Sequence, residues 1–345
     1  MTDRGAVETA ATRACAGPRR LRVAVPWLTR QVVECAGAVE PEAARWLAGR
    51  GRRMCAPDEG WRQWLLGDSE PGAGVLERFP AGPCIRAART RELPRGTWAC
   101  ATPVHLLTAI DHLQIAPPGP VALGADEAAA VAATLGRHFA GAGHAFLCDA
   151  HGGLLWSCAR HLQCTSVEPS LAVGANLREL MPAGRDGQEL RTLMNEVQML
   201  LHEHPVNANR IARGEVPVNA LWLWGIGSVR EATSTLPRLF SDDEWLLGLA
   251  WLHGSGSGAP RDFAGSLATP GGAVAVGWAD PAQSRSTAQA LAEVESECFR
   301  PVRDALVRGL VAEVDLRLGD QCWRLKRGDR WRMWRRARRL SEILT

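Results

Sequence analysis

The sequence lacks several features that would assign it to a class at once. Its 345 residues contain no apolar run long enough to cross a bilayer, which takes about eighteen residues, so no membrane span is expected. The net charge of +3 is too small to indicate nucleic-acid binding by itself. Lys326 is the only lysine, an arginine bias typical of a GC-rich genome. With 46% hydrophobic residues, the chain has enough apolar side chains for a full core.

The first twenty residues also lack the compact apolar segment of a secretory signal. We therefore expect residues 1–20 to form a disordered tail and the protein to be cytoplasmic. Ten cysteines are dispersed along the chain, and without an export signal their thiols are expected to be reduced.

One dense patch of zinc-type ligands needs separate consideration. It comprises Cys148, His151, Cys158, His161 and Cys164. Residues 145–148 and 154–158 read as two strands around a turn, which would place these ligands on alternating faces. The pattern therefore favours small buried or edge cysteines over a zinc site, and no metal is predicted.

The most informative segment lies near the middle of the chain. Leu193, Val197 and Leu201 recur at helical spacing, and Pro205 is expected to end that helix at His204. A polar loop with Asn207, Asn209 and Arg210 should follow. Residues 218–224 form a nearly continuous apolar run, as in a strand that is buried on both faces, and Gly225 and Gly227 end it.

This segment resembles a known family signature. The pattern from His204 to Gly225 reads His-Pro-Val-Asn-x-x-Arg-x-x-x-Gly-x-x-x-x-Asn-x-x-Trp-x-Trp-Gly. It is similar to the signature of archaeal-type, cofactor-independent phosphoglycerate mutases of the alkaline phosphatase superfamily. It is more similar still to the bacterial "regulatory protein, RpfE type" family. Weaker similarities lie at residues 102–106, 111–113, 248–254 and 331–336.

The resemblance implies a fold and a division of the chain. We expect an α/β protein with an alkaline-phosphatase-like, mostly parallel sheet that is flanked by helices. Residues 21–95 and 167–345 would form this core, and residues 96–166 an inserted α+β subdomain. The runs 21–25, 218–224 and 273–278 are predicted to be interior strands of the one sheet.

Local patterns predict further elements. Helices are expected over 40–50, 126–139, 242–252 and 287–309, the last interrupted near Pro301. Strands are expected over 99–107 and 112–115. Alternating residues on either side of Gly319-Asp320 predict a hairpin over 311–327.

The sequence contains few of the residues that the metal chemistry of the superfamily would need as ligands. Two metal ions would require clustered Asp and His side chains. Where the resemblance implies an Asp motif after the first strand, the chain reads Val25-Pro-Trp-Leu, and no histidine soon follows Asp280. Asp111-His112 is a single pair, and His202 and His204 point apart on a helix. Thr29 is the only hydroxyl near the expected nucleophile position, and a helix cap is its alternative role.

Three functions remain open. We expect a non-catalytic regulatory or binding protein without a cofactor, whose partner is a small anionic ligand or another protein. The alternative is an active phosphoglycerate mutase or phosphatase that uses Mn or Mg. A second alternative is nucleic-acid binding through the Trp/Arg-rich residues 323–339, which would otherwise form an amphipathic helix. The expected ligand site comprises Asn207, Arg210, Asn219, Trp224, Gly225 and Gly227. Arg210 could instead anchor its loop to Glu196 or Glu215.

Overall fold

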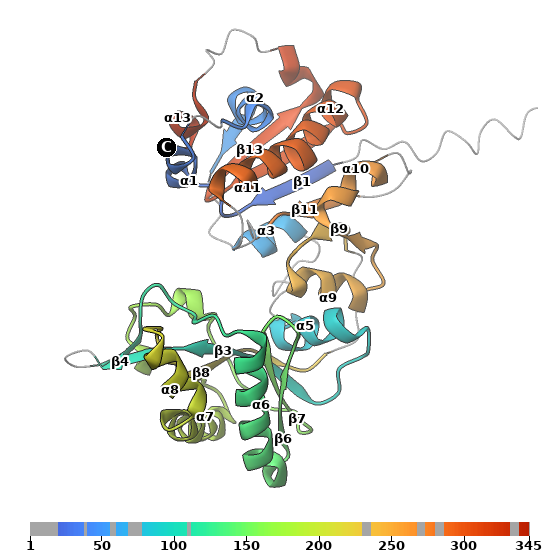
Figure 1. Cartoon of the computed structure of the whole chain (residues 1–345). Coiled ribbons are helices and arrows are strands. Elements are labelled where there is room, and N and C mark those ends of the chain that lie inside the picture. The colour runs from blue at the N-terminus through green and yellow to red at the C-terminus, as the bar shows by residue number, and fades with distance from the viewer. Residues whose placement is uncertain are drawn as a thin grey trace, which may run out of the picture. The chain divides into compact units, whose positions relative to one another are not determined.

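A computed structural model describes most of the chain (Figure 1). It covers residues 20–37, 40–55, 60–67, 78–108, 112–229, 236–267, 273–279, 286–331 and 338–344. The chain divides into two compact units, unit 1 with Met1–Val75 and Thr233–Thr345 and unit 2 with Leu76–Ala232. The disordered tail expected over residues 1–20 lies outside the described residues except for Arg20.

Unit 1 contains a seven-stranded, mostly parallel sheet. Its strands, in spatial order, are β10 (Ser257–Gly258), β9 (Arg238–Ser241), β11 (Val274–Gly277), β1 (Arg20–Val25), β12 (Glu313–Leu318), β13 (Gln321–Lys326) and β2 (Arg52–Met54). The first five are parallel, while β13 and β2 are antiparallel additions at one edge. The predicted hairpin around Gly319-Asp320 is confirmed as β12–β13.

Helices cover both faces of this sheet. They are α1 (Arg30–Cys35), α2 (Glu42–Arg50), α3 (Trp61–Leu66), α9 (Glu244–Leu252), α10 (Phe263–Ser266), α11 (Thr287–Val294), α12 (Arg300–Arg308) and α13 (Leu340–Ile343). A π-helical turn over Glu295–Phe299 separates α11 from α12, so the interruption expected near Pro301 is present.

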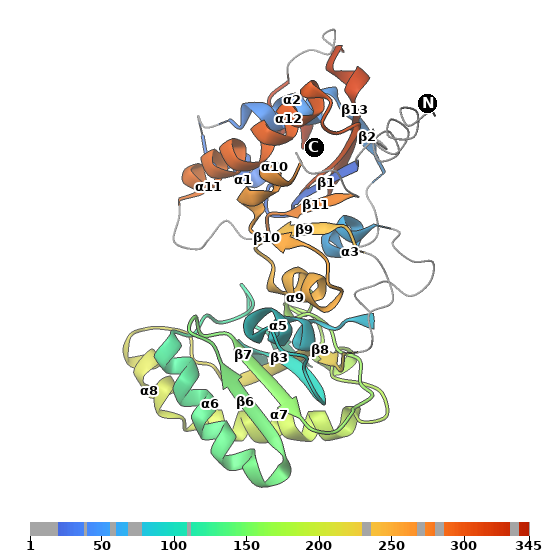
Figure 2. The same ribbon diagram turned by 90° about the vertical axis from the view of Figure 1, so that its right-hand side faces the viewer.

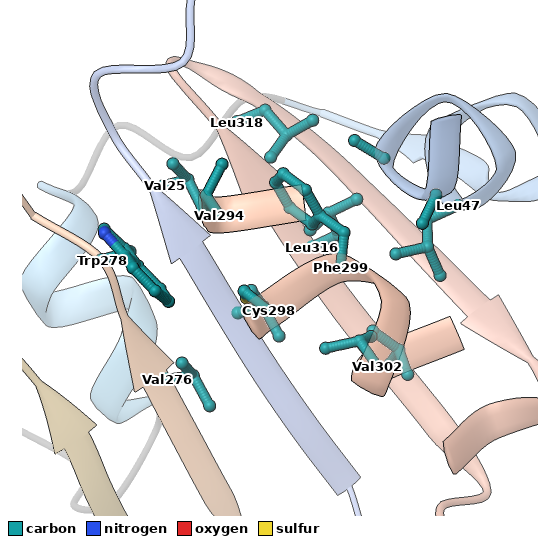
Figure 3. Packing of buried hydrophobic residues seen from close by; sticks show 14 of the residues in the cluster. Val25, Leu47, Val276, Trp278, Val294, Cys298, Phe299, Val302, Leu316 and Leu318 are labelled. Atoms are coloured by element: carbon teal, nitrogen blue, oxygen red, sulfur yellow. The ribbon is translucent and has the colours of Figure 1, made fainter. Parts of the chain in front are cut away.

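The core of unit 1 forms where α2, α11 and α12 pack on alternate residues of β1 and β12 (Figure 3). Val25, Leu316 and Leu318 point from the strands toward Val294 and Phe299, and all five are fully buried. Arg22 on β1 and Asp315 on β12 face the other side of the sheet, because successive side chains of a strand point to alternate faces. On that side, the guanidinium of Arg22 lies against Gly67 at the end of α3.

Unit 2 is an α+β unit around an antiparallel sheet. The strand order is β6 (His144–Cys148), β7 (Leu154–Cys158), β3 (Thr97–Val104) and β8 (Ala220–Gly227), beside a separate hairpin of β4 (Leu106–Thr108) and β5 (Leu113–Ile115). The helices are α5 (Ala81–Thr90), α6 (Ala125–Phe139), α7 (Gly187–His202) and α8 (Pro205–Ala212). Residues of α6 and α7 join one hydrophobic core with the strands, and Figure 2 shows α5 on the side of the sheet away from α7.

Placing residues 218–224 in the parallel sheet was wrong. These residues belong to β8, which pairs antiparallel with β3 in unit 2, whereas β1 and β11 neighbour each other in unit 1. A strand buried on both faces has the same apolar pattern in either kind of sheet, so the pattern could not distinguish them. The inserted unit accordingly spans residues 76–232 and is wider than the expected 96–166.

The polar loop expected after Pro205 was also wrong. Pro205 is the first residue of helix α8, and the side chain of His204 caps it. Proline suits this position because the first helical N–H has no intrahelical acceptor and the ring presets a helical φ. Asn207, Asn209 and Arg210 therefore lie on a helix, which changes what their side chains reach.

None of the described helices combines the length and apolar character needed to cross a membrane. The fold class predicted from the sequence is confirmed: a mixed α/β protein with a mostly parallel sheet and an inserted α+β unit.

Candidate functional site

Asn207 connects three segments of unit 2 with its side-chain amide. Its Nδ2 donates to the carbonyls of Leu201 and Val218, both at 2.7 Å. Its Oδ1 accepts from the backbone N–H of Val218 at 2.8 Å. The side chain is buried, so these bonds satisfy groups that water does not reach. Asn207 thus connects the end of α7 to Val218, which lies just before β8.

Arg210 lies one turn further along α8 and is held by several acceptors. Its Nε donates to the carbonyl of Val216 at 2.8 Å, and its Nη1 to the carbonyl of Ala122 at 3.3 Å. Nη1 also pairs with Glu127 at 2.6 Å and more distantly with Glu215 at 3.5 Å. The side chain is only 8% exposed. This arrangement matches the anchoring alternative: Glu215 is one of the two expected partners, but Glu127, at the shorter distance, is the main one.

Glu127 bridges two arginines at the start of α6. Its carboxylate accepts from Arg210 and Arg213, each at 2.6 Å, and from the Gly124 N–H at 3.2 Å. Partial burial by itself would raise the pKa of Glu127. The hydrogen bonds from Arg213 and Gly124 and the charge of Arg210 outweigh this effect and lower the pKa below its usual value. The carboxylate is therefore ionised at neutral pH.

His204 connects α8 to α6. Its Nδ1 accepts from the Val206 N–H at 3.3 Å, which leaves the ring proton on Nε2, 3.0 Å from the hydroxyl of Thr134. Burial lowers the pKa of His204, and the positive charge of Arg137 adds to the effect. The neutral ring is the form that the fold requires.

A pH-dependent stability should follow from this histidine. Because the folded-state pKa lies below the ordinary histidine pKa of about 6.5, the unfolded chain binds more protons between the two pKa values. The contribution of His204 to stability is complete above the ordinary pKa and is lost as the pH falls below it. His204→Asn keeps a capping acceptor but cannot titrate, so its unfolding free energy should fall less between pH 7 and pH 5. Urea denaturation at both pH values measures the difference, and parallel losses in the two proteins would contradict it.

The other predicted site residues also bond to the chain itself. Asn219 forms two hydrogen bonds with the backbone of Leu106, accepting at 2.6 Å and donating at 2.9 Å. The indole of Trp224 donates to Thr102 at 2.7 Å. Gly225 has a φ of +58°, and a Cβ at this position would come within 2.6 Å of the Ala81 Cβ. A Cβ at Gly227 would come within 2.5 Å of the Pro80 side chain. Because these two positions are glycines, Pro80 and Ala81 at the start of α5 can pack against β8.

The structure separates the predicted site into two places. Asn207 and Arg210 lie before β8, whereas Gly225 and Gly227 lie near its end. Glu127, which completes the Arg210 cluster, was not among the predicted site residues. Its only signal in the sequence was an acidic residue in the first turn of a helix, and that pattern does not reveal a partner 83 residues away.

The carboxyl edge of the parallel sheet is where open α/β folds usually place ligands. Thr29 caps α1 there, with the Val32 N–H 3.5 Å from its hydroxyl. Asp242 accepts from the Ala279 N–H at 2.6 Å. Asp243 caps α9 through the Leu246 N–H and pairs with Arg62 at 2.9 Å. The oxygen ligands described at this edge therefore serve helix caps, a backbone contact and an ion pair.

These residues do not fit the two metal ions that the resemblance implies. No group of three or more His, Cys, Asp or Glu side chains within the described part of the chain could hold a metal ion. Asp111 and Asp280 lie outside that part. His202 and His204 have separate places, the first exposed at the end of α7 and the second buried as the cap of α8.

The five zinc-type ligands are not brought together either. Cys148 and Cys158 lie at opposite ends of the β6–β7 hairpin, since Cys148 pairs with Leu154 and Cys158 with His144. His161 contacts the hydroxyl of Ser228 at 2.8 Å. Burial raises the pKa of Cys164 to about 11, which disfavours the thiolate that zinc requires.

The C-terminal Trp/Arg segment is only partly described. Trp323 is buried in the core of unit 1 on β13, so it offers no stacking surface. Trp331 is 65% exposed, and Arg330 lies over its ring at 4.9 Å. Trp334 lies outside the described residues. Over residues 323–331 the structure has a strand and a short 3-10 turn instead of the amphipathic helix.

Sequence comparison connects the chain to one group of enzymes. It is 37% identical over 70 residues to a probable 2,3-bisphosphoglycerate-independent phosphoglycerate mutase from Geobacter sulfurreducens, which covers 20% of this chain and 18% of that protein. It is 35% identical over 71 residues to the corresponding mutase from Methanosarcina barkeri, covering 21% and 17%. Over these segments the chain is similar to 2,3-bisphosphoglycerate-independent phosphoglycerate mutases. The matched segments span less than a fifth of these curated relatives, and no protein-family model matches the chain.

Structural comparison extends over more of the chain. The PH0037 protein from Pyrococcus horikoshii superposes with a TM-score of 0.50 at 13% identity, over 90% of this chain and 87% of that one. This likeness shows a shared fold. A cofactor-independent phosphoglycerate mutase from Thermoplasma acidophilum covers 89% of this chain and 90% of that one, with a TM-score of 0.41 at 15% identity.

Proposed function

We propose that this protein is a non-catalytic relative of the cofactor-independent phosphoglycerate mutases that acts in the cytoplasm as a regulatory or binding protein of the RpfE type. The observation that carries the proposal is the carboxyl edge of the parallel sheet. There, Thr29 and Asp243 cap helices, and Asp242 accepts a backbone N–H. Metal-dependent phosphotransfer needs such oxygens to converge on the ions instead.

The proposal includes no cofactor and gives unit 2 the binding role. The polar residues of the signature, Asn207, Arg210 and Asn219, form hydrogen bonds that hold α8 and the start of β8 in place. They would have this structural role whether or not the protein is an enzyme. The partner is a small anionic ligand or another protein. An active mutase or phosphatase that uses Mn or Mg is the alternative, and it would need ligands from outside the described residues.

Metal analysis together with activity assays tests the proposal. The purified full-length chain, exchanged into buffer with manganese and then desalted, should retain far less than one equivalent of metal. It should not interconvert 2- and 3-phosphoglycerate. It should also not hydrolyse p-nitrophenyl phosphate faster than a protein-free control does. Near-stoichiometric manganese together with turnover of either substrate would overturn the proposal.

The chain offers a control for a weak positive result. Asp242→Asn retains an oxygen acceptor for the Ala279 N–H but removes a carboxylate from the sheet edge. Turnover that disappears in this variant would originate in the protein and confirm the enzyme alternative. Turnover that the variant retains unchanged would show that the Asp242 carboxylate takes no part in it.

A further inference from the structure

Apolar and basic side chains lie together at one end of unit 1. Val307 in the last turn of α12, Leu310 after that helix and Trp331 after β13 are 40%, 47% and 65% exposed. Figures 1 and 2 show the red turn that ends at Trp331 at the extremity of unit 1. Together with nearby basic residues these side chains form the apolar-basic patch. Its basic members are Arg308, Lys326, Arg327 and Arg330.

The end of α12 leaves Leu310 in an unusual environment. Gly309 ends the helix with a φ of +80°, and the N–H of Leu310 donates to the Ala305 carbonyl at 2.9 Å. At this kind of helix end, the apolar residue after the glycine commonly packs back on the helix. Here Val311 is buried instead, and Leu310 remains nearly half exposed. Packing within unit 1 therefore does not account for a leucine at this position.

Arginines hold the two segments of the patch together. Arg330 Nη1 donates to the Val307 carbonyl at 2.9 Å, and its guanidinium lies over the Trp331 ring at 4.9 Å. The guanidinium of Arg327 lies 2.9 Å from the place that a Cβ on Gly309 would occupy. Cations near a helix C-terminus also interact favourably with the partial negative charge there. The patch is therefore formed before any partner arrives.

The patch carries a net positive charge. Asp329 is the acidic residue of the turn, and its carboxylate accepts from the Lys326 N–H at 2.8 Å. Glu313 lies opposite Lys326 in the β-ladder but pairs with Arg324 at 2.9 Å. The surplus of cations favours an anionic partner.

The apolar members decide between anionic partners. A nucleic acid could stack a base on Trp331, but it offers no apolar surface comparable to the aliphatic side chains of Val307 and Leu310. A bilayer offers both parts, because anionic headgroups attract arginine and lysine and the acyl boundary lies directly beneath them. Tryptophan is itself enriched at this interface. The combination favours a membrane surface.

We propose that the apolar-basic patch attaches the protein to the surface of a bilayer that contains anionic phospholipids. Trp331 lies among the headgroups, Val307 and Leu310 reach the acyl boundary, and the arginines pair with lipid phosphates. This contact lies in unit 1, so it is additional to the binding role proposed for unit 2 and does not rest on it.

Vesicle flotation of the full-length chain tests the proposal. One set of vesicles is pure phosphatidylcholine, and the other contains phosphatidylglycerol as well. At about 0.1 M salt the anionic vesicles should bind the protein at least about tenfold more tightly than the neutral ones, and about 0.5 M salt should weaken this binding severalfold. Equal binding to both kinds of vesicle, or binding to neither, would overturn the proposal.

Leu310→Ser tests the apolar contact without a change in charge. Its affinity for anionic vesicles should fall by about fivefold or more, because a leucine no longer reaches the acyl boundary. Leu93→Ser makes the same change at a 65% exposed position of unit 2, and it should bind as the parent does. If both variants bound as the parent does, charge alone would hold the protein and the insertion of the patch would be refuted.

Arg327→Ser tests the electrostatic contact. The affinity for anionic vesicles should fall by about fivefold. Arg178→Ser removes the same charge at an exposed position of unit 2 and should have little effect. Equal losses in the two variants would show that net charge, and not this patch, governs binding. Arg308→Ser, at the exposed end of α12, repeats the test in case the contact of Arg327 with Gly309 is needed for folding.

Two soluble polyanions distinguish the other possible partners. A single-stranded oligonucleotide and polyglutamate, each at the same charge concentration as the vesicles, should displace little of the bound protein. Displacement of most of the protein by either polyanion, with an affinity that Leu310→Ser leaves unchanged, would assign the patch to a nucleic acid or to an acidic protein and would overturn the proposal.

Discussion

Replacing Asn207 by aspartate is expected to destabilise unit 2 by about 3 kcal/mol or more, because a buried group would lose both donors. The Nδ2 bonds to the carbonyls of Leu201 and Val218 would disappear, and a buried carboxylate would face both oxygens instead. Burial of a charge without a partner adds to the cost. Urea denaturation followed by tryptophan fluorescence measures the change.

Asn209→Asp is the matched control for this experiment. It makes the same chemical change on the same helix, at an exposed side chain for which the structure gives no hydrogen bond. Its unfolding free energy should stay within about 0.5 kcal/mol of the parent, as for most surface substitutions. Similar losses in the two variants would show that Asn207 does not connect α7 to β8 as described.

Arg210→Leu is expected to have an effect of comparable size, about 3 kcal/mol, because it removes one partner of a largely buried ion pair. Glu127 would lose its bond to Arg210 but retain Arg213, and the carbonyls of Val216 and Ala122 would lose their donor. Arg210→Lys keeps the charge but loses the planar fork, so it should recover only part of the stability. The unfolding free energies of both variants test this order.

Arg213 provides the comparison within the same cluster. It contacts Glu127 at the same 2.6 Å as Arg210 does, but 49% of its side chain is exposed. Exposed ion pairs contribute little because water solvates both charges, so Arg213→Leu should lower the unfolding free energy much less than Arg210→Leu does. If Arg213→Leu destabilised the protein as much as Arg210→Leu, burial would not be what makes Arg210 important.

Local patterns were sufficient for most elements because the features that define them are near in sequence. The helix predicted over 126–139 is α6 at Ala125–Phe139, and the predicted hairpin strands are β6 and β7. Helical spacing, acidic residues in the first turn and apolar strands around a glycine-rich turn are all readable within one segment. The interruption near Pro301 was readable for the same reason.

The role of Pro205 shows the limit of a local signal. A proline that cannot continue one helix is favourable as the first residue of the next. The outcome depends on a cap, and His204 provides it through Nδ1, which accepts from the Val206 N–H, while its Nε2 contacts Thr134 on α6. The sequence pattern contains the proline and the histidine but not the contact between α8 and α6.

The residue pattern alone was enough to predict the fold class, several of the helices and many of the strands, and it showed that few metal ligands lie around the first strand. The pairing of β8 with β3 and the anchoring of Arg210 by Glu127 followed only from the folded protein. Periodicity reports which faces of a segment are buried, but it does not report which segment covers them. Pairings across 83 or more residues are set by the packing of the whole unit, so they became visible only in three dimensions.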